Sequence, residues 1–479
     1  MKQLSILKQA VLIISVILLS GCIRDNGNSQ KDQGPELEGK RFFTLATVVR
    51  VRQIEVSRDE AHGWDESGVH TPAEARVFRE TIARAWPGAR ITWAFSWLAL
   101  KDQRSDYVEL RELVASYHRK YGDEITFIPG GYFANMYNSR EQVNLDLHEG
   151  LQMVSAMVGD GYRPNSVIAG FLSAENQRYL AEEEGIHVCQ GNIWSQHAID
   201  KGDGEGSISY PYYPSREHFC KPARGKEDFI DIVNLDGWTI DFVNATYPGA
   251  KHINGERCGS RQGVGPIETV IRLGTERGTK EMLACTEAHF DTGFDLNGFA
   301  WITCIWELGL VEARKFREGY QGRNGMEGME IWLGEMQKRW PEAKCITHGE
   351  FGLIWREHFK NNDDINYRFV QRGSGVCGSE EHLEVKWYMN RDFRLAFQRN
   401  WMEDAPWKVI DFTRYDLEAE EPADPTPGEH SRTWSLMNRL NQKGTRPQDV
   451  PIDIGELNAG EQALIKKWYP ELLAAESRN

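Results

Sequence analysis

Strand-like and helix-like segments alternate along the chain from residue 42 to residue 347. The strand-like segments are Phe42–Val56, Ile91–Leu100, Ile125–Phe133, Ser166–Leu172, Ile186–Ile193, Gly237–Val243, Met282–Ala288 and Lys344–Thr347. The helical patterns are Pro72–Ala85, Asp106–Lys120, Ser139–Val158, Asn176–Glu184, Ile267–Arg277 and Gly328–Arg339. This alternation predicts an α/β fold with a parallel sheet, most simply a (β/α)7-8 barrel. An open doubly wound sheet is the alternative, but no glycine-rich phosphate turn follows the first strand.

The alternation stops after Asn361. The segments "NYRFVQRGSG", "HLEVKWYMNRDFRLAFQRN" and "WKVIDFTRYDLE" have the pattern of short strands joined by turns. They predict a small C-terminal antiparallel β domain over residues 362–418, after a barrel over residues 41–361. Residues 419–479 are predicted to be an acidic, proline-rich linker followed by a helical segment.

The N-terminus has the features of an export signal. Two lysines precede an apolar run from Ala10 to Leu19, and the run ends in Leu-Ser-Gly-Cys at Cys22. This run is too short for a mature transmembrane helix. It resembles a bacterial lipoprotein signal peptide over residues 1–21, which implies lipidation of Cys22 and a disordered tether over residues 22–40. We therefore expect an exported protein, anchored by lipid to a bacterial membrane and facing the periplasm or the cell surface.

The net charge bears on the ligand. The formal charge is −15 and the sequence contains no basic tract. Phosphate backbones are bound through clustered Lys and Arg, so a nucleic-acid partner is not expected. An acidic protein favours a neutral or cationic ligand.

A family resemblance emerges from the order of segments between Val69 and Trp194. A helix leads into "ARITWAFSWLA", a third strand precedes the long helix "SREQVNLDLHEGLQMVSAMV", and "VIAGFLSAEN" is followed by a helix and "GIHVCQGNIWS". This order resembles the glycoside hydrolase/polysaccharide deacetylase barrel superfamily. It more closely resembles an uncharacterised family of bacterial lipoproteins that join such a barrel to a small C-terminal β domain. The resemblance implies a carbohydrate-active barrel.

The sequence departs from the metal-dependent members of that superfamily. Deacetylases carry an Asp pair after the first strand and a His-x-x-x-His pair after the third, whereas the third-strand segment here, "IPGGYFANMYN", has no histidine. No cofactor is therefore predicted. A divalent metal stays open as an alternative, because a relocated site could use the acids and histidines of one segment, Asp59, Glu60, His62, Asp65 and His70.

The predicted site consists of acids, histidines and aromatic residues at predicted strand ends, which form the active face of such barrels. Hydrolysis of a glycoside needs two carboxyl groups on either side of the bond that is cleaved. The candidate catalytic residues are Glu287, Asp291, His348 and Glu350. The family's last strand also ends in a functional histidine, which favours His348. The candidate substrate-binding residues are Glu175, Asn192, Trp194, Gln196 and His289.

These residues are expected to meet at one barrel mouth and to act on a poly- or oligosaccharide. The favoured function is a glycoside hydrolase with paired carboxylates. Two alternatives stay open: a metal-dependent carbohydrate deacetylase, and a non-catalytic glycan-binding lipoprotein, which the missing motifs and the 16 Trp residues would suit.

Overall fold

The structure is a computed structural model. It describes residues 36–193, 206–246, 251–253, 256–258, 261–311, 325–426, 434–436 and 451–474. The predicted signal peptide, Cys22 and most of the tether lie outside these residues, and so do Trp194 and Gln196. In the described part of the chain, no helix is both long and apolar enough to cross a membrane.

The first part of the fold is a parallel sheet centred on β1 (Arg41–Val49). Its other strands are β4 (Thr92–Phe95), β5 (Glu124–Phe127), β11 (Ala300–Ile305) and β12 (Lys344–Ile346). β1 pairs with β11 and β4, β4 pairs with β5, and β12 pairs only with the first half of β1, at Phe42–Thr44. Nearly every residue of β1 is buried, as the apolar run predicts for a central parallel strand.

A second parallel sheet contains β6 (Val167–Ile168), β7 (Val188–Gln190) and β8 (Val233–Leu235). It approaches the first sheet on two sides. The Thr126 hydroxyl in β5 donates to the Ser166 carbonyl just before β6 at 2.6 Å. On the other side, the Thr239 N–H, after β8, donates to the Thr303 carbonyl in β11 at 2.9 Å.

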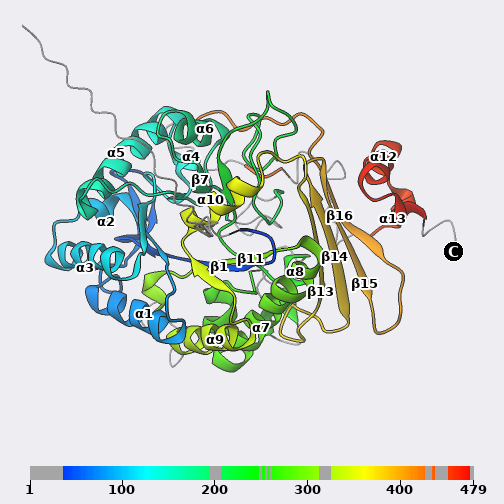
Figure 1. The fold of residues 1–479 in the computed structure, drawn as a ribbon, viewed down its shortest axis with the longest axis horizontal. Coiled ribbons are helices and arrows are strands. Elements are labelled where there is room, and N and C mark those ends of the chain that lie inside the picture. Colours follow the sequence, from blue (N-terminus) through cyan, green and yellow to red (C-terminus); the bar gives the residue numbers. More distant parts are fainter. Residues whose placement is uncertain are drawn as a thin grey trace, which may run out of the picture. The chain divides into compact units, whose positions relative to one another are not determined.

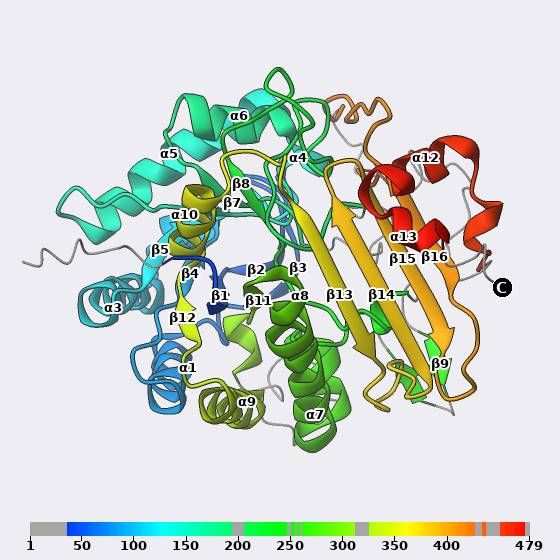
Figure 2. The same cartoon turned by 45° about the vertical axis from the view of Figure 1, so that its right-hand side comes forward.

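Helices surround the strands (Figures 1 and 2). They are α1 (Pro72–Ala85), α2 (Trp97–Lys101), α3 (Ser105–Tyr121), α4 (Ala134–Tyr137), α5 (Arg140–Val158), α6 (Ala174–Glu182), α7 (Thr275–Glu287), α8 (Phe294–Asn297), α9 (Gly325–Arg339) and α10 (His348–His358). Hydroxyl side chains cap several of them, since Thr71, Ser139, Ser173 and Thr347 each accept a backbone N–H of the first turn. Short 3-10 or π turns occur at Asn244–Thr246, Ile267–Ile271, Ala288–Gly293, Leu308–Leu310 and Ile454–Glu456.

Two strand predictions are wrong, and two strands of the parallel sheets were missed. Met282–Ala288 belongs mostly to helix α7, in which Met282, Cys285 and Thr286 are buried at helical spacing. Gly237–Val243 forms no strand beyond a single bridge at Ile240. The missed strands are β8, which precedes Gly237–Val243, and β11, which follows Met282–Ala288.

The antiparallel part of the chain is a four-stranded sheet of β13 (Asn366–Arg372), β14 (Leu383–Asn390), β15 (Phe393–Asn400) and β16 (Lys408–Arg414), in that order. One face packs on the parallel part through Phe369 and Trp387. The other face packs against α12 (Ala459–Trp468) and α13 (Pro470–Ala474), as Figure 2 shows. Two short hairpins complete the fold, β2 (Arg52–Glu55) with β3 (Ala61–Asp65) and β9 (Lys251–Ile253) with β10 (Glu256–Cys258).

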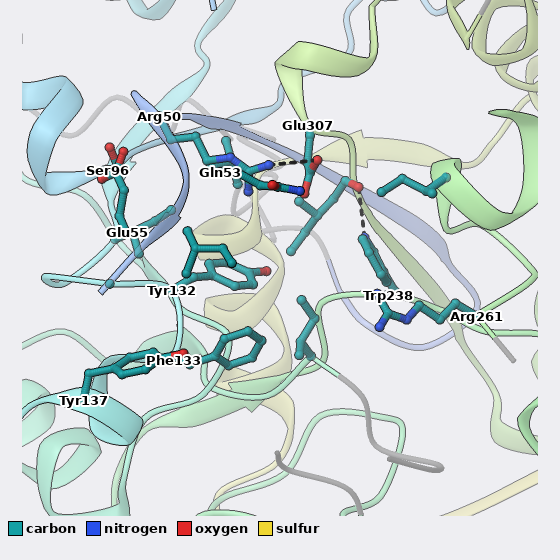
Figure 3. Close-up of a pocket in the computed structure, with 17 residues that line it drawn as sticks. Arg50, Gln53, Glu55, Ser96, Tyr132, Phe133, Tyr137, Trp238, Arg261 and Glu307 are labelled. Atoms are coloured by element: carbon teal, nitrogen blue, oxygen red, sulfur yellow. Dashed lines mark hydrogen bonds and ion pairs between the residues drawn. The ribbon is translucent and has the colours of Figure 1, made fainter. Parts of the chain in front are cut away.

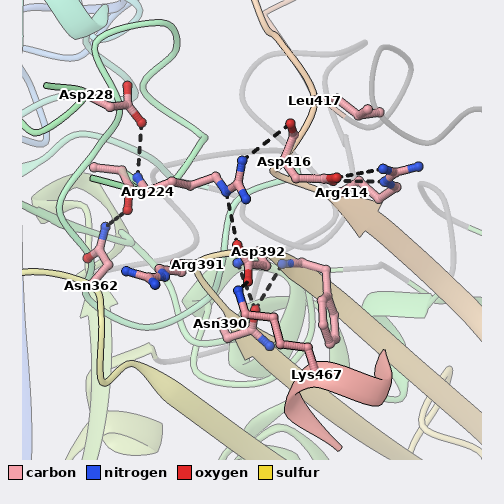
Figure 4. Close-up of polar contacts among 12 residues, drawn as sticks. Arg224, Asp228, Asn362, Asn390, Arg391, Asp392, Arg414, Asp416, Leu417 and Lys467 are labelled. Carbon is pink, nitrogen blue, oxygen red and sulfur yellow. Dashed lines mark hydrogen bonds and ion pairs between the residues drawn. The ribbon is translucent and has the colours of Figure 1, made fainter. Parts of the chain in front are cut away.

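Asp392 binds side chains of α12 and so holds this helix against the sheet (Figure 4). Its carboxylate accepts from Lys467 Nζ at 2.5 Å, from Trp468 Nε1 at 2.7 Å and from Arg224 Nε at 3.0 Å. Burial alone would raise the pKa of Asp392, but these hydrogen bonds hold it below its ordinary value. These contacts dock α12 on the antiparallel sheet.

Candidate active site

A cavity of about 170 Å³ opens at the carboxyl ends of the parallel strands. Its lining comes from residues just after β1, β4, β5, β7, β8 and β11, and from β2. Carboxyl ends of parallel strands are where such folds place their ligands. The polar and aromatic residues labelled in Figure 3 are Arg50, Gln53, Glu55, Ser96, Tyr132, Phe133, Tyr137, Trp238, Arg261 and Glu307.

Arg50, directly after β1, binds two carboxylates. Its Nε and Nη2 donate to both oxygens of Glu66, and Nη2 also donates to Glu307 Oε2 at 3.2 Å. Glu307 follows β11, so this ion pair joins the ends of neighbouring strands (Figure 3). Burial alone would lower the pKa of Arg50, but the two carboxylates raise it above its ordinary value, so the guanidinium stays charged.

Glu66 lies behind this pair, with only 2% of its side chain exposed. Burial would raise its pKa, but the hydrogen bond from His70 and the charge of Arg50 lower it to about 2. His70 Nδ1 accepts the Arg50 backbone N–H at 3.3 Å, so the ring proton is on Nε2, which donates to Glu66 Oε2 at 3.2 Å. Glu66 is therefore an anion with a fixed orientation.

Glu55 supplies a second carboxyl group to the cavity. It ends β2 and is buried, and its Oε1 accepts the backbone N–H groups of Val51 and Arg52 at 2.7 and 3.0 Å. Its Oε2 is buried and has no hydrogen-bond partner among the described residues. Glu55 is one of the residues that line the cavity, and a hydrogen-bonding ligand group would satisfy this buried oxygen.

An aromatic wall completes the cavity. Tyr132, Phe133 and Tyr137 come from the segment after β5, and Trp238 comes from the segment after β8. Trp238 Nε1 donates to the Ile305 carbonyl at 2.9 Å, which fixes the indole beside β11. Burial raises the pKa of the Tyr132 phenol above its ordinary value, so it stays a neutral hydroxyl. Flat apolar faces next to polar groups suit a sugar ring or another amphipathic ligand.

The structure does not bring the predicted catalytic residues into this cavity. Glu287 ends α7 and pairs with Arg339, and Asp291 accepts Trp340 Nε1 at 2.7 Å. Both line an open groove of about 820 Å³ between α7 and β13. Arg41, the first residue of β1, donates to the nearby Phe290 carbonyl, so this groove lies at the amino ends of the strands.

Glu350 also lies near the amino end of a strand, but in another environment, and His348 lies between the strands. Glu350 is in the first turn of α10, where its N–H is capped by Thr347 and its carboxylate pairs with Arg90, just before β4. The His348 N–H donates to the Thr92 hydroxyl at 3.0 Å, at the first residue of β4. Neither His348 nor Glu350 lines the groove that holds Glu287 and Asp291, so the structure does not bring the four predicted catalytic residues into one pocket.

Two of the predicted histidines are buried inside the protein. His289 contacts the Tyr210 hydroxyl through Nδ1 at 3.1 Å, and His348 contacts the Thr303 hydroxyl through Nε2 at 3.1 Å. Burial lowers the pKa of each to about 3, so both are neutral at physiological pH. His289 packs among aromatic rings rather than in a pocket.

The remaining predicted residues are dispersed. Glu175 is in the first turn of α6 and lies 3.8 Å from Arg140 in a different depression, of about 430 Å³. Asn192 is buried and donates to the Ser207 hydroxyl at 2.5 Å. Asn192 immediately precedes Ile193, which lines the cavity. Among the predicted site residues that the structure describes, only Asn192 is the direct neighbour of a lining residue in the sequence.

The alternative metal site is not formed by the described residues. They contain no group of three or more His, Cys, Asp or Glu side chains that could hold a metal ion. His62 pairs with Glu60 on the exposed hairpin, at 2.8 Å, whereas His70 pairs with buried Glu66. The donor set that a catalytic divalent metal needs is therefore not assembled by Asp59, Glu60, His62, Asp65 and His70.

Sequence reasoning missed Arg50, Glu55, Glu66, Tyr132 and Glu307. One signal was available: Arg50 and Glu307 each follow an apolar run, "FFTLATVV" and "AWITCIW", that ends in a charged residue. The second run was not recognised as a strand.

Comparisons with known proteins bear on the whole chain. A family model described as a domain of unknown function with a solved structure (DUF3863) matches residues 35–389, and a similarly described model (DUF3864) matches residues 394–472. The boundary between these two matches falls between β14 and β15, inside the antiparallel sheet. No curated protein matches the chain.

Among solved structures, a candidate glycoside hydrolase/deacetylase from Parabacteroides distasonis is 49% identical, with a TM-score of 0.85. The match covers 91% of this chain and 99% of that protein. A candidate polysaccharide deacetylase from Mycobacterium smegmatis is 13% identical over 68% of this chain and 93% of its own, with a TM-score of 0.40. A GH57 branching enzyme from Thermococcus kodakaraensis is 12% identical over 63% and 69%, with a TM-score of 0.39. These two TM-scores are too low to support a conclusion about function.

Proposed function

Because the chain belongs to the DUF3863 family and is 49% identical to a candidate glycoside hydrolase/deacetylase, we propose that it is a carbohydrate-active enzyme, a glycoside hydrolase. The resemblance expected from the sequence, to a family that joins such a fold to a C-terminal β sheet, is confirmed at the level of the family. The reaction is our proposal. It rests on one observation: two carboxyl groups, Glu55 and Glu307, line a single cavity at the carboxyl ends of the parallel strands.

Glu307 is suited to act as the base or nucleophile. Glycoside hydrolysis needs one carboxylate that attacks the anomeric carbon or activates water for that attack. Arg50 donates to Glu307 through a single hydrogen bond to Oε2, which supports an anion at this position and leaves Oε1 outside the ion pair.

Glu55 is suited to act as the proton donor. The leaving oxygen of a glycoside must receive a proton as the bond breaks. Two backbone N–H groups hold Glu55 Oε1, whereas buried Oε2 has no partner among the described residues. A proton carried on Oε2 would therefore not be held by another described protein group.

The remaining lining supports a sugar as the ligand. Tyr132, Phe133 and Trp238 offer ring faces for stacking, and Gln53 and Ser96 offer hydrogen-bonding groups for hydroxyls. We propose a poly- or oligosaccharide as the substrate. Asn192 next to the cavity remains a candidate substrate-binding residue.

We further propose that the two parallel sheets close into a (β/α) barrel over residues 41–361. The hydrogen bonds from Thr126 to Ser166 and from Thr239 to Thr303 support closure, because they link the sheets at both of their edges. Closure would bring the ends of β1, β7, β8 and β11 around one mouth.

Export and lipid anchoring at Cys22 remain part of the proposal. They rest on the apolar run and the Leu-Ser-Gly-Cys sequence that ends it. An anchored hydrolase of this kind would meet polysaccharide outside the cytoplasm.

A glycan screen tests the function. The purified protein would be incubated with polysaccharides, oligosaccharides and acetylated sugars, with and without a chelator, and both new reducing ends and released acetate would be measured. We expect new reducing ends that chelation does not suppress. Acetate release abolished by the chelator would instead favour the metal-dependent deacetylase, and binding without turnover would favour a glycan-binding protein.

A further inference from the structure

Arg50 is shared unequally between its two carboxylates. Glu66 receives two hydrogen bonds, from Nε and from Nη2, the latter at 3.1 Å. Glu307 receives one, from the same Nη2, at 3.2 Å. The exposed fraction of the side chain is 2% for Glu66 and 16% for Glu307. Glu66 is therefore the main, buried partner of the guanidinium, and Glu307 is its cavity-facing second partner.

Glu66 is itself held from behind. His70 Nε2 donates to Glu66 Oε2, and His70 Nδ1 accepts the backbone N–H of Arg50. The Arg50 carbonyl accepts the Tyr107 hydroxyl at 2.8 Å. These contacts form a closed ring of hydrogen bonds through residues 50, 66 and 70, so neither the guanidinium nor Glu66 can rotate without breaking at least two of them.

We propose that Glu66 is a positioning residue for Glu307, acting through Arg50. By binding the guanidinium in a bidentate fashion, it offsets the charge of Arg50 and restricts Glu307 to a single hydrogen bond. One oxygen of Glu307 is thereby left for the substrate. This inference rests on the proposed function, because it matters for catalysis only if Glu307 reacts.

Removal of Glu66 would change this arrangement in a defined way. A guanidinium pairs with a carboxylate through two parallel hydrogen bonds when geometry allows. Without Glu66, the uncompensated Arg50 would turn onto Glu307 and occupy both of its oxygens. The groups that face Glu307 are Arg50 and Glu66 on one side and, around the cavity, Glu55, Arg261 and Tyr132; His70 lies behind Glu66.

The test compares Glu66→Gln and Glu66→Asp with a matched control, Glu384→Gln. Glu384 likewise accepts arginine hydrogen bonds, from Arg372 Nε at 3.0 Å and Arg399 Nε at 2.7 Å, and its side chain is also buried (7% exposed), but it lies in the antiparallel sheet, outside the cavity. All three full-length variants would be checked for folding by circular dichroism. Crystal structures of the wild type and Glu66→Gln would then show the Arg50–Glu307 contact.

We expect Arg50 to contact both oxygens of Glu307 in Glu66→Gln. An unchanged single contact in a folded variant would overturn the inference, and this result needs no substrate. With an active glycan, we expect Glu66→Gln to lower kcat at least 10-fold with little change in KM, Glu66→Asp to restore part of it, and Glu384→Gln to leave it unchanged.

The pH dependence of the rate distinguishes a role of Glu66 in positioning Glu307 from a mere loss of packing around Glu66. The acidic limb of the rate profile reports deprotonation of the catalytic base. Loss of the negative charge of Glu66 should move this limb to lower pH, and loss of the positive charge in Arg50→Met should move it to higher pH, each by about one pH unit or more. Shifts in the same direction would overturn the inference. Unchanged turnover in Glu307→Gln would instead overturn the proposed function, and the crystal structures would still decide the role of Glu66.

Discussion

Gly150 in α5 lies directly against the ring of Phe127 in β5. A Cβ at position 150 would come within 2.2 Å of Phe127 Cε2, far inside normal contact distance. Helix α5 packs on β5, and this glycine sets how closely the two elements approach. Because β5 leads into the aromatic wall of the cavity, the contact also supports the candidate site.

Gly150→Ala should therefore destabilise the protein, although alanine is the better helix former. Overpacking of a core typically costs about 1–3 kcal/mol, which exceeds the gain of about 1 kcal/mol in helix propensity. Gly334→Ala in α9 is the matched control, because a Cβ there meets nothing within 4 Å. Urea denaturation should show a lower free energy of unfolding for the first variant and an equal or higher one for the second. Stabilisation by both would contradict the packing.

Glu307→Gln and Glu55→Gln should each lower glycan turnover by about 10²–10⁴-fold, because an amide can neither give nor take the proton. Folding should change little, as size and shape are kept. Glu287→Gln and Glu350→Gln are the controls, since these carboxylates pair with Arg339 and Arg90 away from the cavity. Initial rates on the active glycan measure the effect. If Glu287→Gln and Glu350→Gln lost most activity while Glu307→Gln and Glu55→Gln kept it, the active site would lie at the amino ends of the strands instead.

The buried histidines should make the protein sensitive to mild acid. Burial lowers the pKa of His289 and His348 to about 3 from the ordinary 6.5, so folding keeps both neutral. Their contribution is fully present above pH 6.5 and is lost as the pH falls toward 3. Below about pH 6 each histidine takes up a proton only in the unfolded chain, so each should lower the free energy of unfolding by about 1.4 kcal/mol per pH unit.

Denaturation curves between pH 7.5 and 5 would measure that dependence. His348→Gln should show a shallower decline, because one proton fewer is taken up on unfolding. His358→Gln, at a partly exposed histidine near the end of α10, should keep the wild-type slope. Equal slopes for all three proteins would mean that His348 does not drive the effect.

Cys22→Ser should abolish lipid attachment and release the protein from the membrane fraction or leave its precursor unprocessed. The thiol is the only group in the Leu-Ser-Gly-Cys sequence that can carry the thioether-linked lipid. Metabolic labelling with a fatty acid, followed by fractionation, measures this. Normal labelling of the variant would exclude Cys22 as the anchor.

The local features of the fold could be predicted from the sequence because they depend on neighbouring residues. Apolar runs predicted β1, β4, β5 and β12, helical spacing predicted α1 and α5, and the change of period after Asn361 predicted the antiparallel sheet. In each case the decisive contacts lie within one turn or one strand.

The position of the site was decided by the tertiary structure. Strands run toward one end of such a fold and helices run back, so one wrong assignment moves a residue to the opposite end. Because Met282–Ala288 is mainly helical, Glu287 and Asp291 arrive at the amino end of β11 instead of the carboxyl end of a strand. Glu350 is displaced for a related reason, since β12 pairs only with the first half of β1 and stops there.

The sequence by itself determined the family, the parallel architecture and the presence of charged residues after apolar runs. Only the tertiary structure decided which of those residues meet. Arg50 and Glu307 are 257 positions apart and become neighbours through the pairing of β1 with β11. No local pattern encodes that pairing, because it depends on how the whole set of strands and helices packs.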